Sequence, residues 1–367
     1  MIQMNDFGAE PAALREAMLA AIRRVIDSGW YVLGDEVRSF EEQWAAVCGT
    51  ACAVGVGNGM DAIEIALRTL NIGPGDEVIT TSMTAYATVL AILRAGAIPV
   101  LADIEPDTAL LSLESAQRCI SSRTKAVILV HLYGQVRKMA AWIEFCHENN
   151  AWLIEDCAQS HLASWQGKVA GNFGEVGAYS FYPTKNLGTL GDGGMLVTNN
   201  LCLAADAMRM RNYGQSDRYH HPEFGMNSRL DELHAAILRE RIKWLKIFTE
   251  RRRSIAHAYE VGITNSLVKK MIPPEEDAAH VYHLYVVTCK WRDALQFHLN
   301  KNQVQALIHY PIPVHHQKQC LQIMRDPCGL PVSEYHAAMC LTLPVHPQMS
   351  DADVTQVISA VNSFRGD

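Results

Sequence analysis

The chain has 367 residues, of which 49% are hydrophobic and 19% charged, as in a globular protein long enough for about two domains. Its 32 basic and 39 acidic residues give a net charge of −7, which opposes binding to nucleic acid unless basic side chains gather on one face. We expect no nucleic-acid partner, because the basic run from Arg251 to Arg253 falls on a predicted helix and is interpreted as a solvated face.

The predicted elements begin with a helix over residues 9–28, ended by Gly29. After it, helical patterns alternate with short apolar runs. Further helices are predicted over 60–70, 85–95 and 137–149. Strands are predicted over 77–80, 98–103, 125–132, 151–156, 177–182 and 194–198. Almost continuously apolar strands are buried on both faces, so the pattern predicts an α/β fold, a mostly parallel central sheet with flanking helices.

A second unit follows a long helical pattern over residues 229–260. Segments 281–289 and 303–310, with the helical patterns after them, predict a smaller C-terminal α+β domain. We place a large domain at 1–240 and a small one at 241–367. The long helix could belong to either unit, and the amino-terminal helix could pack on the small one.

The sequence shows no export or membrane signal. Its amino terminus lacks a basic segment followed by an apolar segment and a cleavage site. The longest apolar stretch, 87–102, is broken by Arg94 and Pro99 and is shorter than the roughly 20 residues of a membrane span. We expect a soluble, cytoplasmic protein with no membrane partner.

Cysteines and histidines give little indication of a metal site. The ten cysteines form no CxxC pair and mostly lie in apolar surroundings, which predicts reduced core thiols. The adjacent pairs His220/His221 and His315/His316 could bind a metal in principle, but neither accompanies a matching cysteine or an HExxH pattern. We therefore expect no metal site.

A glycine-rich turn precedes the helix predicted at 60–70. It contains Gly57, Asn58 and Gly59, and such a turn offers free backbone amides and the positive end of a helix dipole, which suit a phosphate. Simple helix capping by Asn58 explains the turn equally well. The dinucleotide fingerprint requires a third glycine where the chain has Met60, which disfavours a nicotinamide dehydrogenase.

Two charged residues suggest a specific cofactor. Asp156 ends a predicted buried strand, and Lys185 lies in SFYPTKNLGTLGDGG, among glycines rather than among other charges. Ligands of open α/β sheets lie beyond the carboxyl ends of the strands. Pyridoxal 5'-phosphate needs a lysine to form a Schiff base and a carboxylate to keep its pyridine nitrogen protonated. Alone, Asp156 could merely cap the next helix. Tyr86 begins a predicted helix and could stack on the ring, although a core tyrosine is equally compatible.

Several ordered motifs then carry a family resemblance. The segments VGNGMDAIEIAL, TAYATVLAILRAGAIPVLADI, EDCAQSHLA, SFYPTKNLGTLGDGGML and GMNSRLDELHAAIL resemble the DegT-type sugar aminotransferases, which belong to fold type I of the pyridoxal phosphate enzymes. The resemblance extends from SGWYVLGDEV near residue 28 to LTLPVHPQMS near residue 350. It implies that Lys185 binds the cofactor and transfers the substrate proton, while Asp156 pairs with the pyridine nitrogen. By the same likeness, Gln159 lies near the ring hydroxyl and Tyr86 covers one ring face.

The resemblance also implies a phosphate site shared between two subunits. Gly59, Met60 and Ser180 would hold the phosphate together with Asn227 of the partner subunit, which implies a homodimer with shared active sites.

Substrate choice follows from a further likeness. ALIHYPIPVHHQ resembles the stretch of relatives that aminate carbon 3 of a nucleotide-linked 3-keto-6-deoxy sugar. His309 and Tyr310 would contact the hexose, Tyr182 would face it, and Arg218 would meet the pyrophosphate from the neighbouring subunit. A thymidine diphosphate carrier and L-glutamate, released as 2-oxoglutarate, are implied by the family. Alternatively, YPIP is a rigid turn beside surface histidines.

Other activities stay open. Leu162 and Ser164 stand where family members commonly have small residues, which leaves substrate fit in question. Amination at carbon 4 and a catalytically idle regulatory or sensor role are the alternatives. Lys185 argues against the deoxygenating branch, which has histidine there.

Overall fold

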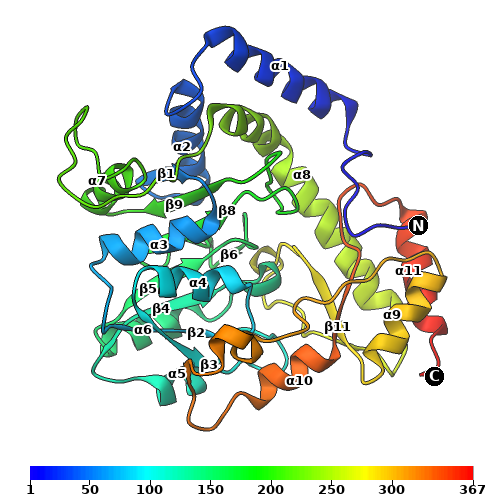
Figure 1. Cartoon of the computed structure of the whole chain (residues 1–367). Coiled ribbons are helices and arrows are strands. Elements are labelled where there is room, and N and C mark those ends of the chain that lie inside the picture. Colours follow the sequence, from blue (N-terminus) through cyan, green and yellow to red (C-terminus); the bar gives the residue numbers. More distant parts are fainter. Residues whose placement is uncertain (367) are drawn as a thin grey trace.

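The computed structural model describes residues 1–366 and has an eight-stranded sheet at its centre (Figure 1). The strand order is β1-β9-β8-β5-β4-β2-β3-β12. Strand β9 is antiparallel to both of its neighbours, and all the remaining neighbouring pairs are parallel. The strands of this sheet are β1 (Cys52–Val56), β2 (Glu77–Thr81), β3 (Ile98–Ala102), β4 (Thr124–Val130), β5 (Trp152–Asp156), β8 (Val176–Ser180), β9 (Gly194–Thr198) and β12 (Met324–Arg325). The predicted mostly parallel sheet is confirmed.

Helices cover both faces of this sheet. The helices of the large unit are α1 (Ala12–Ser28), α2 (Asp35–Cys48), α3 (Gly59–Thr69), α4 (Tyr86–Arg94), α5 (Leu113–Cys119), α6 (Met139–Glu148), α7 (Leu201–Met210) and α8 (Glu232–Gly262). One core contains buried residues of α2, α5, α6 and α8, and the other those of α3, α4 and α7. Gly29 ends α1 in the left-handed conformation, at φ 64°. The flanking helices expected from sequence periodicity are therefore present.

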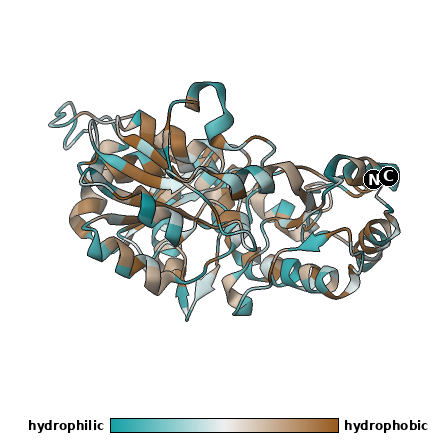
Figure 2. Cartoon of the chain, turned by 90° about the horizontal axis from the view of Figure 1, so that it is seen from below, coloured by the Kyte–Doolittle hydropathy of each residue, from teal (hydrophilic) through white to brown (hydrophobic). Residues whose placement is uncertain are grey.

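A smaller unit lies at the other end of α8. Its three-stranded antiparallel sheet consists of β10 (Lys269–Lys270), β11 (Tyr285–Thr288) and β13 (Cys340–Leu343), with α9 (Arg292–Lys301), α10 (Pro331–Met339) and α11 (Asp351–Ser363). The first residues of the chain join this unit, because Ile2 exchanges backbone hydrogen bonds with Gln303 and Gln305 at 2.7 and 2.9 Å. Both marked chain ends lie on the side of the molecule that this unit forms; they are well apart in Figure 1 and one in front of the other in Figure 2.

The helix α8 links the two units. Its Leu245 is buried in the core of the large sheet, whereas Ile255 and Tyr259 are buried in the core of the smaller unit. The amino-terminal helix α1 packs on the first half of α8, where Leu14 of α1 and Ile237 of α8 belong to one buried apolar cluster. A boundary at residue 240 falls inside this continuous helix and stays a prediction.

The expected solvated face at residues 251–253 is wrong for its middle residue. Arg252 is buried, and its guanidinium donates to the backbone carbonyls of Val345 and Tyr282. Burial lowers the pKa of Arg252 to about 10. The physical reason is that the smaller unit packs against the second half of α8. A helix face that looks polar in sequence therefore contacts protein rather than water.

The state of the cysteines and the lengths of the helices agree with the predictions from the sequence. All ten cysteines are free thiols, and seven of them are buried, as predicted. In the described part of the chain, every helix is too short or too polar to span a bilayer.

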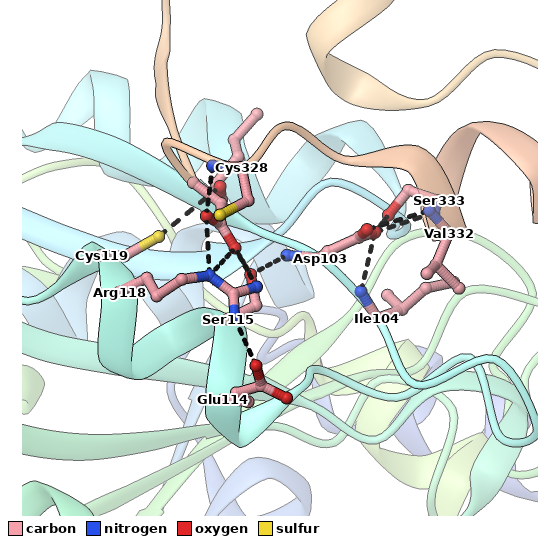
Figure 3. A network of polar contacts seen from close by, with 11 residues as sticks. Asp103, Ile104, Glu114, Ser115, Arg118, Cys119, Cys328, Val332 and Ser333 are labelled. Carbon is pink, nitrogen blue, oxygen red and sulfur yellow. Dashed lines mark hydrogen bonds and ion pairs between the residues drawn. The ribbon is translucent and has the colours of Figure 1, made fainter.

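Two buried aspartates fix the segment that returns from the small unit to the large sheet (Figure 3). Asp326 accepts hydrogen bonds from Arg118 Nη2 at 2.6 Å, from the Cys328 amide at 2.8 Å and from Ser115. Burial alone would raise the pKa of Asp326, but hydrogen bonds from Arg118 and Ser115 outweigh burial and lower it to about 2.

The second aspartate caps α10 from a distance. Asp103 accepts from the amides of Val332 and Ser333 at 2.9 and 2.8 Å and from the Ser333 hydroxyl at 2.6 Å. The residue before α10 is Leu330, whose side chain cannot cap a helix. Residues of the large domain therefore determine where α10 begins.

We expect Asp103→Ala to lower the free energy of unfolding by about 2 kcal/mol, since it leaves the buried Ser333 amide and the partly buried Val332 amide of α10 without acceptors. Urea denaturation followed by circular dichroism measures this loss. Ser350→Ala, which removes the exposed cap of α11, is the matched control and should cost about 1 kcal/mol. A loss for Asp103→Ala no larger than for the control would contradict the capping role.

Candidate active site

Three elements bring the predicted site residues to one edge of the sheet. Asp156 is the last residue of β5, Ser180 is the last residue of β8, and these strands are parallel neighbours. The first turn of α3 packs directly on β8, since a Cβ atom added to Gly59 would lie 2.8 Å from Ser180 Cβ. Only glycine allows this approach, so the turn and Ser180 form one concave surface.

The turn before α3 shows the expected cap and is compatible with the expected anion site. Asn58 caps the helix by accepting from the Asp61 amide at 2.9 Å, and Ser228 Oγ accepts from the Gly57 amide at 2.9 Å. Gly59 and Met60 precede Asp61 in the same first turn, where amides have no acceptor within the helix. Capping by Asn58 thus leaves the Gly59 and Met60 amides for an anion.

Asp156 is a buried carboxylate held by two donors. Thr88 Oγ1 donates to Asp156 Oδ2 at 2.8 Å, and the Ala158 amide donates to Oδ1 at 3.1 Å. Thr88 in turn bonds with Thr84 Oγ1 at 2.9 Å. These contacts fix the orientation of the carboxylate.

Lys185 lies in the tight turn predicted for it. Its amide donates to the Tyr182 carbonyl at 2.8 Å, and a Cβ atom on Gly188 would lie 2.5 Å from the Pro183 carbonyl oxygen. Burial lowers the pKa of Lys185 to about 8, and the negative charge of Asp156 opposes this shift. A lysine with such a pKa is partly unprotonated near neutral pH, which makes it a nucleophile and a base.

The charge of Lys185 acts on two neutral histidines, the buried His161 and the partly buried His309. Burial and the charge of Lys185 lower the pKa of His161 to about 3 and that of His309 to about 4. His161 packs between the rings of Trp44, Tyr179 and Phe181. These imidazoles therefore add no positive charge that would compete with Lys185 for Asp156.

The lowered pKa predicts the reactivity of Lys185 in the cofactor-free enzyme. Below about pH 8 the amine is protonated and unreactive, and above it the free amine dominates. Labelling by trinitrobenzenesulfonate, located by peptide mass spectrometry, should therefore rise with a midpoint near pH 8 instead of near the roughly 10.4 of an ordinary lysine. Exposed Lys246 serves as the reference within the same sample. A Lys185 midpoint above about pH 10 would contradict the shift.

Gln159 connects this centre to the predicted sugar residues. Its Nε2 donates to Tyr310 Oη at 3.2 Å, while its Oε1 accepts from the Tyr133 amide at 2.6 Å. His309 Nδ1 lies 2.8 Å from Thr342 Oγ1. Burial and, to a smaller extent, the charge of Asp156 raise the pKa of Tyr310 to about 12. His309 and Tyr310 therefore come from the small unit to the edge of the site.

The other predicted residues lie further out in the single chain. Tyr86 begins α4, as expected, and its hydroxyl is 3.6 Å from Cys320 Sγ. Tyr182 is half exposed, and Arg218 lies on the loop after α7, stacked on Tyr219. Asn227 is exposed and pairs with Asn212. The structure of one chain therefore brings neither Arg218 nor Asn227 into its own site.

Sequence reasoning missed two residues that support the site. Thr88 contacts Asp156, and Ser228 contacts the Gly57 amide in the turn before α3. Neither residue stands in a sequence pattern that indicates chemistry. Leu162, noted as a departure, adopts φ 69° in the left-handed region that favours glycine, which explains why a small residue would suit this position.

The residues present fit pyridoxal phosphate. The glycine cradle and helix N-terminus suit its phosphate, the buried carboxylate its pyridine nitrogen, and the lysine of lowered pKa its aldehyde. A doubly covered, mostly parallel sheet with these groups at its carboxyl edge defines an aminotransferase of fold type I. The chain belongs to the DegT/DnrJ/EryC1/StrS aminotransferase family, whose model matches residues 12–362.

Characterised relatives cover nearly the whole chain. It is 43% identical, over 99% of both chains, to the dTDP-3-amino-3,6-dideoxy-alpha-D-galactopyranose transaminase of Aneurinibacillus thermoaerophilus. It is 40% identical to the dTDP-3-amino-3,4,6-trideoxy-alpha-D-glucose transaminase of Streptomyces venezuelae, over 98% of this chain and 95% of the relative. The crystal structure of S. venezuelae DesV is similar with a TM-score of 0.94 at 40% identity, over 98% and 97% of the two chains.

Proposed function

We propose that the chain transfers the amino group of L-glutamate to carbon 3 of a dTDP-linked 3-keto-6-deoxyhexose, with pyridoxal 5'-phosphate as cofactor. The observation that carries this proposal is that Lys185, of lowered pKa, lies within reach of the charge of the buried Asp156, at the sheet edge where the first turn of α3 also lies. The names of the two relatives above support carbon 3 and the dTDP carrier.

Each residue of the site has a role in this proposal. When bound, the cofactor supplies an electron sink and carries the amino group between donor and acceptor. The Lys185 amine takes the proton from the substrate carbon and returns it, which its pKa near neutrality favours. Asp156 holds a proton on the pyridine nitrogen, and Gln159 donates to the ring hydroxyl. Tyr86 covers one ring face.

The phosphate and sugar contacts complete the assignment. Gly59, Met60 and Ser180 bind the phosphate. His309 and Tyr310 bind the hexose, and Tyr182 lies beside it.

The site is proposed to be completed by a second copy of the chain. Asn227 of the partner subunit would reach the phosphate, and Arg218 of the partner subunit would meet the pyrophosphate. Support comes from the loop after α7, where Tyr219 is 79% exposed and Phe224 is 93% exposed in the single chain. Such exposed aromatic residues are typical of protein interfaces.

The decisive assay separates the two half-reactions. Glutamate alone should convert the bound cofactor to its amine form with release of 2-oxoglutarate, which excludes an idle sensor. A panel of 3-keto and 4-keto sugars on dTDP and UDP, with the product position determined by NMR, then tests the substrate. Conversion of 4-keto but not 3-keto sugars would overturn the carbon-3 assignment.

Mixed dimers test the shared site. Lys185→Ala and Asn227→Ala should each be nearly inactive, and mixing them after subunit exchange should restore activity in those dimers that have one intact site. Activity that never exceeds the sum of the separate variants would contradict the contribution of Asn227 across the interface.

A further inference from the structure

Tyr133 contacts Gln159 and His309 of the site and has an unusual backbone conformation. It follows β4, is 1% exposed, and adopts φ 64° and ψ 0°, in the left-handed region that bulky residues avoid. A conformation of this kind persists only where the surroundings hold it. The contacts that hold Tyr133 in place therefore indicate what its position serves.

The hydrogen bonds of Tyr133 have an unambiguous direction. Its hydroxyl is 2.7 Å from the His309 carbonyl oxygen and 2.9 Å from His336 Nε2. The carbonyl can only accept, so the single hydroxyl proton points to His309, and His336 must donate through Nε2–H. Burial lowers the pKa of His336 to about 4, which agrees with a neutral imidazole that donates from one nitrogen.

These bonds close a ring between the two sides of the site. The Tyr133 amide donates to Gln159 Oε1 at 2.6 Å, and Gln159 Nε2 donates to Tyr310 at 3.2 Å. His309 and Tyr310 are adjacent in sequence, so the hydroxyl bond to His309 completes the circuit. The neighbouring Gly134 packs so closely on Gln159 that an added Cβ atom would lie 2.8 Å from its carbonyl oxygen. Tyr133 thus joins Gln159 to the His309–Tyr310 segment of the small unit.

We infer that Tyr133 is a positioning residue for the sugar half-reaction, which sets His309 and Tyr310 at the distance from Gln159 that the keto sugar requires. This inference rests on the proposed function. None of the described contacts of Tyr133 involves Lys185 or Asp156, and Asp156 is held instead by Thr88 and Ala158. Glutamate, which reacts at the cofactor without the sugar contacts, should therefore be indifferent to the Tyr133 hydroxyl.

The test is Tyr133→Phe, which keeps the buried ring and the amide bond but removes the bond to His309. We expect the KM for the 3-keto sugar to rise about tenfold with kcat changed less than threefold. The single-turnover rate with glutamate should stay within twofold of wild type. His336→Leu is the matched control: it also removes one buried partner of the hydroxyl but leaves the bond to His309, so its KM for the sugar should change less than threefold.

A purely structural role gives a different pattern. It would slow both half-reactions alike in Tyr133→Phe, or it would raise the KM for the sugar equally in His336→Leu. Either result would overturn the inference. An unchanged KM for the sugar in Tyr133→Phe would also overturn it. Should Tyr133→Phe fold poorly, Thr342→Val tests the same positioning of His309, because it removes the 2.8 Å contact between Thr342 Oγ1 and His309 Nδ1 in a side chain of equal size. It must then raise the KM for the sugar and spare the glutamate rate, and failure to do so also overturns the inference. Failure of the proposed function is distinguishable, because wild-type enzyme would then accept no 3-keto sugar of the panel.

Discussion

Lys185→Ala should lose at least about 10⁴-fold in kcat, because both the covalent attachment of the cofactor and the proton transfer at the substrate carbon depend on this amine. The structure offers no nearby substitute. His161 and His309 approach Lys185, but burial holds their pKa values at about 3 and about 4, too low for an effective base at neutral pH. The loss is measured in single turnovers with glutamate and by the absorbance of the purified protein.

Two further observations separate this role from a structural one. Borohydride should fix the cofactor to Lys185 in the wild-type enzyme, as located by peptide mass spectrometry, and leave Lys185→Ala unlabelled. Lys185→Arg keeps the positive charge in the turn but cannot replace the amine chemically, so it should be as inactive as the alanine variant. A colourless Lys185→Ala that still transaminates would refute the assignment.

The sheet could be predicted from sequence because its strands are buried on both faces. Runs such as KAVILVHL and AWLIED are mostly apolar, and β4 and β5 appear where these runs lie. Strand β1 was missed, since its end, GVGNG, was interpreted as a turn only. Strand β12 has two residues and depends on pairing with β3, so no local pattern marks it.

The site was predictable where residues stand at the ends of strands or in unusual turns. Asp156, Ser180 and Lys185 carry such signals. Thr88 does not, because a threonine in the first turn of a helical pattern resembles any other, and only the approach of the start of α4 to the end of β5 directs it to Asp156. Arg252 shows the opposite error. A run of three arginines predicts a helix face exposed to water, but the Arg252 guanidinium is buried and donates to backbone carbonyls of the smaller unit. These contacts between distant segments have no counterpart in local sequence.

Asp156→Asn should retain the cofactor but lose on the order of 10³-fold in kcat, about 4 kcal/mol of transition-state stabilisation, since an amide cannot hold the pyridine nitrogen protonated. The site keeps its other groups, because the oxygen of asparagine still accepts from the Ala158 amide, while its NH2 group faces the Thr88 hydroxyl, which can accept as well as donate. Cofactor binding, measured by absorbance after dialysis, should therefore change far less than the glutamate half-reaction.

The same substitution also makes a prediction about Lys185 that a merely damaged site would not meet. The charge of Asp156 raises the pKa of Lys185 against the effect of burial, so without that charge the lysine pKa should fall below about 8. The labelling midpoint of the cofactor-free variant should then move to lower pH. Thr88→Val, which removes one donor but keeps the carboxylate, is the matched control: it should leave that midpoint nearly unchanged and cost roughly tenfold in rate. An Asp156→Asn enzyme of near-normal rate would refute the pairing of this carboxylate with the pyridine nitrogen. An unshifted midpoint would show that Asp156 does not act on Lys185 through its charge.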